Sequence, residues 1–155
     1  WQRDRVTALV RGEDESVQGL RSEEVLVSAA VWPYTTDKWD WGVSEGYSDF
    51  YQDARGWLAT GAVGALVPML YGGEADDFLR WEKLMVDFLA EAEGKPIYPG
   101  IGSHYTEFEA ISARIESARA AGAPGHAIFS YSGLDDADAW AALASGPYHV
   151  PADLP

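Results

Sequence analysis

The sequence predicts an α/β protein built from parallel β-strands joined by helices, and two observations lead to this prediction. Amphipathic segments with helical spacing alternate along the chain with short apolar runs in which polar residues do not alternate. Uninterrupted apolar runs are typical of strands that are covered on both faces, as in parallel sheets. The pattern repeats about every 30–40 residues, which is the length of a strand–helix–strand unit.

Each element follows from its own residues. Strands are predicted at four apolar runs, over about residues 25–32, 65–71, 96–102 and 126–132. Helices are predicted around them, over about residues 3–20, 49–60, 78–89, 106–121 and 137–144, before a Pro-rich tail at 146–155. Because parallel neighbours need a crossover connection, and a helix is the usual one, this order favours a parallel sheet.

Two parallel architectures fit this order. One is a doubly wound open sheet, and the other is a closed (β/α)₈ barrel, which needs about 250 residues for its eight units. The 155 residues hold four units, and the chain opens on a helical pattern with no strand before it. We therefore expect residues 1–155 to form the C-terminal half of a (β/α)₈ TIM barrel, strands 5 to 8, without strands 1 to 4. An independent open-sheet domain is the alternative.

Composition and charge limit the kinds of partner and the cellular location that can be expected. The 25 acidic and 11 basic residues give a formal charge of −14, which opposes binding to a nucleic-acid backbone. No apolar run approaches the roughly 20 residues of a membrane helix, so no membrane span is expected. A half barrel would leave its first and last strands with unpaired edges, which predicts self-association. The absence of Cys does not determine the cellular compartment. We expect a secreted or extracytoplasmic location rather than a cytoplasmic one.

The sequence predicts neither a metal site nor a cofactor. The three histidines, His104, His126 and His149, lack the spacing of a helical metal-binding pair. Gly100 and Gly102 follow a strand, but the third Gly of a dinucleotide fingerprint is absent, and so is a phosphate-binding loop. No nucleophile elbow surrounds a Ser.

Five short phrases then occur in order along the chain. They are Trp1-Gln2-Arg3-Asp4-Arg5-Val6-Thr7, Ser28-Ala29-Ala30-Val31-Trp32-Pro33, Tyr51-Gln52-Asp53-Ala54-Arg55-Gly56-Trp57-Leu58, Val67-Pro68-Met69-Leu70-Tyr71 and Tyr98-Pro99-Gly100-Ile101-Gly102. Together they resemble the second half of the barrel of glycosyl hydrolase-like family 10 proteins. With Phe129-Ser130-Tyr131 the resemblance spans nearly the whole chain.

This resemblance implies a (β/α)₈ barrel and a glycoside hydrolase that acts on a polysaccharide or a cell-wall glycan. It also implies that a motif with paired Asp residues, near the end of the fourth strand of relatives, precedes the part of the barrel found here. Met69 stands where some relatives carry Gln, so a polar contact expected at that strand is lost.

Glycoside hydrolysis usually needs two carboxylates, one that protonates the leaving oxygen and one that attacks or activates water. In a barrel they lie at or just beyond the carboxyl ends of strands. Glu74 and Asp40 follow strand ends closely and are the candidate catalytic residues, while the principal acid is expected in the missing half. The alternative for each of these two residues is that it is a solvent-exposed loop charge without a catalytic role, as is common in an acidic protein.

Aromatic residues mark the four predicted strand ends. Trp32, Tyr71, His104 and Tyr131 fall at or just past them, where flat rings can cover the C–H faces of sugars and polar ring atoms can bind hydroxyls. We expect these four residues to bind a carbohydrate substrate. Packing over the core is the alternative for Trp32 and Tyr71. Two functions follow: a glycoside hydrolase fragment, or a non-catalytic carbohydrate-binding or surface protein that uses the barrel as a scaffold.

Overall fold

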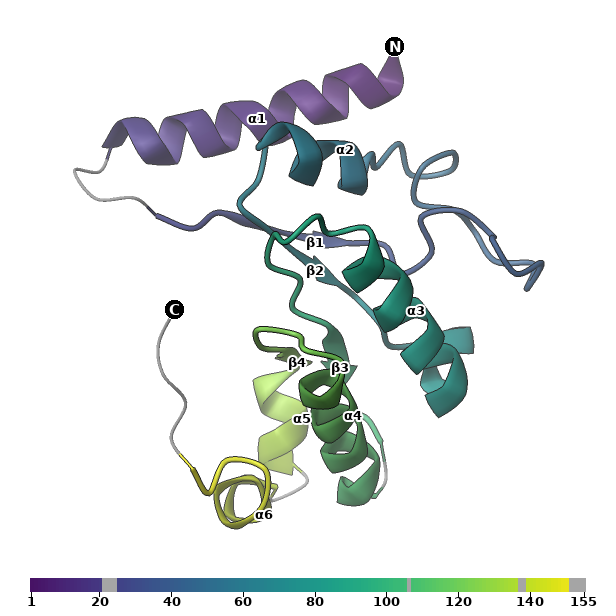
Figure 1. Ribbon diagram of the computed structural model, residues 1–155, viewed down its shortest axis with the longest axis vertical. Helices are drawn as coiled ribbons and strands as arrows, with labels where there is room; N and C mark the ends of the chain where they lie inside the picture. The colour runs from purple at the N-terminus through teal and green to yellow at the C-terminus, as the bar shows by residue number, and fades with distance from the viewer. Residues whose placement is uncertain (21–24, 106, 137–138, 151–155) are drawn as a thin grey trace.

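The structure is a computed structural model of the chain and describes residues 1–20, 25–105, 107–136 and 139–150. In chain order the elements are α1 (Gln2–Leu20), β1 (Ser28–Val31), α2 (Ala54–Thr60), β2 (Ala65–Pro68), the 3₁₀ helix η1 (Gly73–Asp76), α3 (Phe78–Ala90), β3 (Gly100–Gly102), α4 (Phe108–Ala120), β4 (Ala127–Phe129), α5 (Tyr131–Asp136) and α6 (Trp140–Ser145). The molecule is elongated, with α1 and α2 toward one end and α5 and α6 toward the other (Figure 1).

The strands pair in parallel, as the alternation of elements predicts. β1 pairs with β2 so that Ser28 lies opposite Ala65, and β3 pairs with β4 so that Gly100 lies opposite Ala127. Between β2 and β3 there is an isolated parallel bridge at Leu66 and Ile97. Two backbone hydrogen bonds flank it, from Leu66 N to Pro96 O (3.1 Å) and from Tyr98 N to Leu66 O (2.9 Å).

The prediction of a half (β/α)₈ barrel is wrong. In the part of the chain that the structure describes, the strands form two separate two-stranded sheets, and each strand has three or four residues. Pro68 in β2 and Pro96, next to Ile97, lie on the two segments that meet at this bridge. Proline has no backbone N–H to donate to a ladder, so the contact between the two sheets does not extend along the chain.

Two local predictions also differ from the structure. The predicted helix at 49–60 begins only at Ala54, because the Asp53 carboxylate caps it by accepting a hydrogen bond from Gly56 N (3.1 Å). The predicted strand at 126–132 ends at Phe129, and Tyr131 already begins α5. The last predicted helix is α6, which starts at Trp140; residues 137–138 of that prediction, and 151–155 of the Pro-rich tail, lie outside the described residues.

One apolar core joins both sheets. It runs from Val31 and Leu66 through the inner face of α3 to Ile101 and Ile115. Trp81 of α3 is fully buried, and its Nε1 donates a hydrogen bond to Gly100 O of β3 (3.0 Å). The buried side chains of α3 therefore join the apolar residues of the β1–β2 sheet to those of the β3–β4 sheet in one core.

Helix α1 is attached differently. None of its residues, all of which are described, is buried, and Val6 and Val10 only pack against the edge of the core. The Thr7 hydroxyl oxygen accepts a hydrogen bond from Trp57 Nε1 (2.8 Å), and Arg3 donates one to Tyr47 O (3.0 Å). Over the described residues, no helix has the length and apolarity that crossing a membrane requires.

Candidate functional site

A pocket lies where the chain leaves β1 and β2. It has a volume of about 390 Å³, and its wall includes Trp32, Tyr34, Met69, Tyr71 and Glu74. We call it the Trp32–Tyr71 pocket. The predicted sugar-binding residues of the first two strand ends therefore share one cavity with a predicted catalytic carboxylate.

Trp32 is held in place from several sides. Its backbone N–H donates to Gln52 Oε1 (2.8 Å), and its indole Nε1 donates to Ser44 O (2.8 Å). The ring lies against Phe50, with the ring centroids 4.5 Å apart. Gly46 allows the loop to close over this residue, because a Cβ there would lie 3.2 Å from Trp32 Cβ. Hydrogen bonds and packing therefore hold Trp32 in the pocket wall.

Tyr71 forms another part of the wall. Its ring stacks on Phe129 of β4, with the centroids 5.3 Å apart and the planes 4° from parallel. Gly100 lets the ring approach β3, since a Cβ there would lie 2.9 Å from Tyr71 Cε1. Burial raises the pKa of the Tyr71 phenol above its ordinary value. The hydroxyl is therefore protonated at neutral pH and can donate a hydrogen bond.

Glu74 lies in η1 and forms an ion pair with Arg80 of α3. Two glycines with positive φ, Gly72 (85°) and Gly73 (60°), turn the chain into η1. The Tyr34 hydroxyl oxygen accepts a hydrogen bond from Ala75 N (3.1 Å), which fixes η1 to the segment after β1. Desolvation by burial raises the pKa of Tyr34. The Glu74 carboxylate thus presents acceptors at the pocket wall, and Arg80 pairs with it from α3.

Asp40, the other predicted catalytic residue, is not in the pocket wall. It is exposed and has a positive φ of 54°, in the loop between β1 and α2. The loop is shaped by Asp37 instead, whose carboxylate accepts hydrogen bonds from Trp41 N (2.8 Å) and Gly42 N (2.7 Å). The structure therefore does not place Asp40 and Glu74 together in this pocket.

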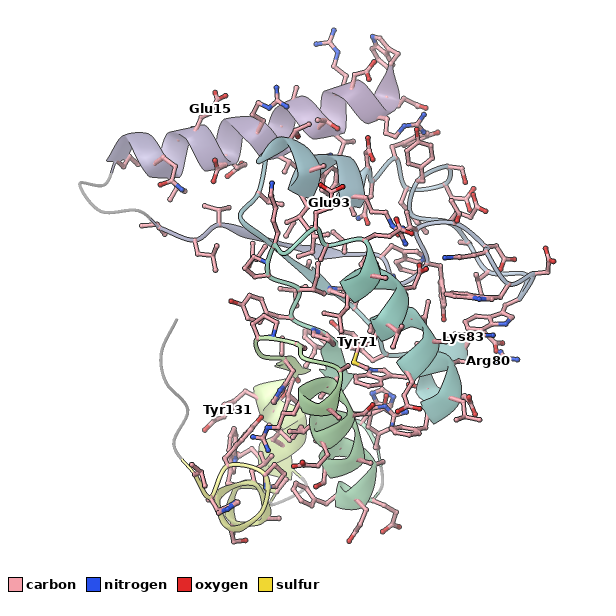
Figure 2. The ribbon with its side chains drawn as sticks, in the orientation of Figure 1. Glu15, Tyr71, Arg80, Lys83, Glu93 and Tyr131 are labelled. Carbon is pink, nitrogen blue, oxygen red and sulfur yellow. The ribbon has the colours of Figure 1, made fainter. Side chains whose placement is uncertain are left out.

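The remaining predicted aromatic residues lie elsewhere. His104 Nε2 is 2.9 Å from Asp76 Oδ1, and the His104 ring lies beside Gly102, whose added Cβ would also meet Tyr71. Tyr131 belongs to α5, is 70% exposed, and packs against Trp140 with the centroids 4.9 Å apart. Figure 2 labels Tyr71 near the middle of the molecule and Tyr131 below and to the left of it, on α5. His104 is thus close to one wall of the pocket, and Tyr131 is not part of it.

Two residues of the site were missed by the sequence analysis. Tyr34 stands two residues after Trp32, and in an extended chain residues i and i+2 lie on the same side, so this spacing was a usable signal. Arg80 lies six residues from Glu74, a spacing that does not bring two residues together on one helix. Its pairing depends on the turn between η1 and α3, which local patterns do not show.

Comparison with protein-family models finds no match, and neither does comparison with curated proteins. The resemblance to glycosyl hydrolase-like family 10 therefore stays a prediction that rests on the short phrases alone. Among the described residues, no group of three or more His, Asp or Glu side chains is arranged to hold a metal ion.

Proposed function

We propose that this chain binds carbohydrate and that the Trp32–Tyr71 pocket holds a sugar ring. The observation that carries the proposal is the composition of the pocket wall, where aromatic rings from two chain segments meet the carboxylate of Glu74. Aromatic faces suit the C–H faces of a sugar, and a few placed polar groups suit its hydroxyls. In the pocket wall, Tyr71 supplies a donor and Glu74 supplies an acceptor.

Binding is favoured over hydrolysis by the same geometry. Hydrolysis by the usual route needs two carboxylates that flank the scissile bond. The described pocket wall offers Glu74, which is already paired with Arg80, whereas Asp40 lies outside the wall. Glycoside hydrolysis is the second candidate, favoured by one observation: Glu74, a predicted catalytic residue, does line the cavity.

The test is sugar binding by the full chain, measured by protein-observed NMR titration with neutral sugars such as glucose, N-acetylglucosamine and their β-1,4-linked oligomers. We expect Tyr71→Ala to weaken binding roughly three- to tenfold, since an aromatic contact is worth about 0.5–1.5 kcal/mol. Glu74→Gln should weaken it about tenfold or more, because a hydrogen bond to a charged group contributes about 1.5–3 kcal/mol.

Matched controls are available in the same chain. Tyr131→Ala removes an exposed tyrosine, and Glu15→Gln removes a carboxylate of α1; both residues lie away from Tyr71 in Figure 2. Neither should change the affinity. Wild-type protein that binds none of these sugars, or pocket variants that bind as well as the two controls, would refute the proposal. Release of new reducing ends, lost in Glu74→Gln, would establish the hydrolase instead.

A further inference from the structure

We propose that the stacked pair Trp39 and Trp41 forms a second sugar subsite next to the Trp32–Tyr71 pocket, so that the ligand is an oligosaccharide chain of neutral sugars. This inference rests on the proposed function of the pocket. It adds the length and the charge of the ligand, which the pocket alone does not define.

The first step is that the aromatic surface continues beyond the pocket. The rings of Trp39 and Trp41 have centroids 4.9 Å apart and planes at 25°. Trp41 meets Tyr34, a residue of the pocket wall, edge to face, with the centroids 6.4 Å apart at 87°. Val43 and Ser44, just beyond Trp41 in the chain, also line the pocket. The tryptophan pair and the pocket are thus parts of one loop surface.

The second step is that polar donors follow the same surface. Arg80 pairs with Glu74 in the pocket wall, and its guanidinium lies 4.9 Å from the centroid of the Trp41 ring. Lys83, one turn further along α3, places its ammonium group 5.5 Å from the centroid of the Trp39 ring. Figure 2 shows Arg80 and Lys83 as neighbours on α3. A sugar beside the tryptophan pair would therefore find hydrogen-bond donors for its hydroxyls.

The third step is that hydrogen bonds within the loop already order it in the absence of a ligand. The Asp37 carboxylate accepts hydrogen bonds from Trp41 N and Gly42 N, and Asp37 N itself donates to Glu45 Oε1 (2.8 Å). Glu45 Oε2 accepts a hydrogen bond from Ser48 Oγ (2.6 Å). A site that is already ordered loses less conformational entropy on binding. Both tryptophans stay partly exposed in this arrangement, although Arg80 and Lys83 lie over part of their ring faces.

The charges around Trp39 and Trp41 indicate whether the bound sugar is neutral or acidic. Two of the three cations near the tryptophans are neutralised, since Lys38 pairs with Asp87 and Arg80 pairs with Glu74. The exposed Asp40 carboxylate lies between the two tryptophans in the chain, and the whole chain carries −14. Such a field repels an acidic ligand. An uncharged chain satisfies the donors without that repulsion.

The experiment compares a monosaccharide with a tetrasaccharide of the same neutral sugar, for example N-acetylglucosamine and its β-1,4-linked tetramer, bound to the full chain. We expect the tetrasaccharide to bind wild type about tenfold tighter. Trp39→Ala should remove roughly three- to tenfold of the tetrasaccharide affinity and leave the monosaccharide affinity unchanged, given the usual worth of an aromatic contact. Asp37→Ala keeps both rings but releases the loop, so the tetrasaccharide should again lose its advantage.

Trp140→Ala is the matched control, because Trp140 of α6 is a partly exposed tryptophan that packs against Tyr131 of α5. Circular dichroism of each variant is the check that the fold is kept. Equal affinities of the two sugars for wild type, or a Trp39→Ala protein that behaves like Trp140→Ala, would overturn the second subsite while leaving the pocket intact. Failure of both sugars to bind wild type would overturn the pocket and the subsite together.

Discussion

Replacing Trp81 with Phe tests whether α3 holds the two sheets together. Trp81 is fully buried, and its indole N–H is bonded to Gly100 O at 3.0 Å. Phe removes the donor and strands a buried acceptor, which costs about 1–3 kcal/mol. The smaller ring leaves about 40 Å³ unfilled, which at roughly 24 cal/mol per Å³ adds about 1 kcal/mol. We expect the free energy of unfolding to fall by about 2–4 kcal/mol in total.

Urea denaturation followed by far-UV circular dichroism measures this loss, because the change in tryptophan content would distort a fluorescence signal. The midpoint should fall while the dependence on urea stays the same, which marks a change in stability alone. In a thermal scan the same loss lowers Tm by about 2–4 °C for each kcal/mol. Trp140→Phe, at a residue that is 39% exposed, should change stability by less than about 0.5 kcal/mol. A Trp81→Phe protein as stable as this control would refute the reasoning.

Two further predictions concern the site and the C-terminal region. Gly102→Ala should destabilise the protein by about 1–3 kcal/mol through overpacking. The added Cβ would lie 3.1 Å from Tyr71 Cβ and 2.4 Å from His104 Cε1. Gly12→Ala is the control in the same urea assay: nothing lies within 4 Å of that Cβ, so this change should be neutral or stabilising. Burial lowers the pKa of His126, so the unfolded chain binds the proton more readily than the folded one. The free energy of unfolding should therefore fall as the pH drops below about 6.5, the ordinary His pKa. Urea midpoints at pH 7 and pH 5 should converge partly in His126→Gln, and an unchanged difference between them would contradict this assignment.

The positions of the elements could largely be predicted from the sequence, because each depends on residues close together in the chain. The apolar runs containing Val31, Leu66, Ile101 and Ile128 do contain the four observed strands, and they pair in parallel. The pairing between β2 and β3 could not be predicted. It depends on which backbone groups are free to donate, and Pro96 and Pro68 remove the donors that would extend the ladder beyond the bridge between Leu66 and Ile97.

The start of α5 shows the same limit. Tyr131 and Ser132 continue an apolar run and look like strand residues, yet they are helical. Ser103, far away in the chain, accepts a hydrogen bond from Ser130 N (2.7 Å) with its hydroxyl oxygen and packs against Gly133, where a side chain would collide. This contact turns the chain out of the strand immediately. Because it depends on a partner in another loop, no local pattern of the sequence reveals it.

The site was predicted in part for the same reason. Trp32, Tyr71 and Glu74 each follow a strand end, and β1 and β2 are neighbours, so their ends converge. Tyr131 follows β4, which belongs to the other sheet, and the structure places it apart. The separation of the sheets therefore explains which predicted residues share the pocket.

Helix α1 has a consequence for how the protein loses its structure. A helix with no buried residue adds little to the cooperative core, so it can open by itself at a small cost in free energy while the remainder stays folded. Its amide protons should exchange with deuterium well before those of α3. A protease should cut first within α1, releasing an N-terminal peptide from a body that still contains the Trp32–Tyr71 pocket.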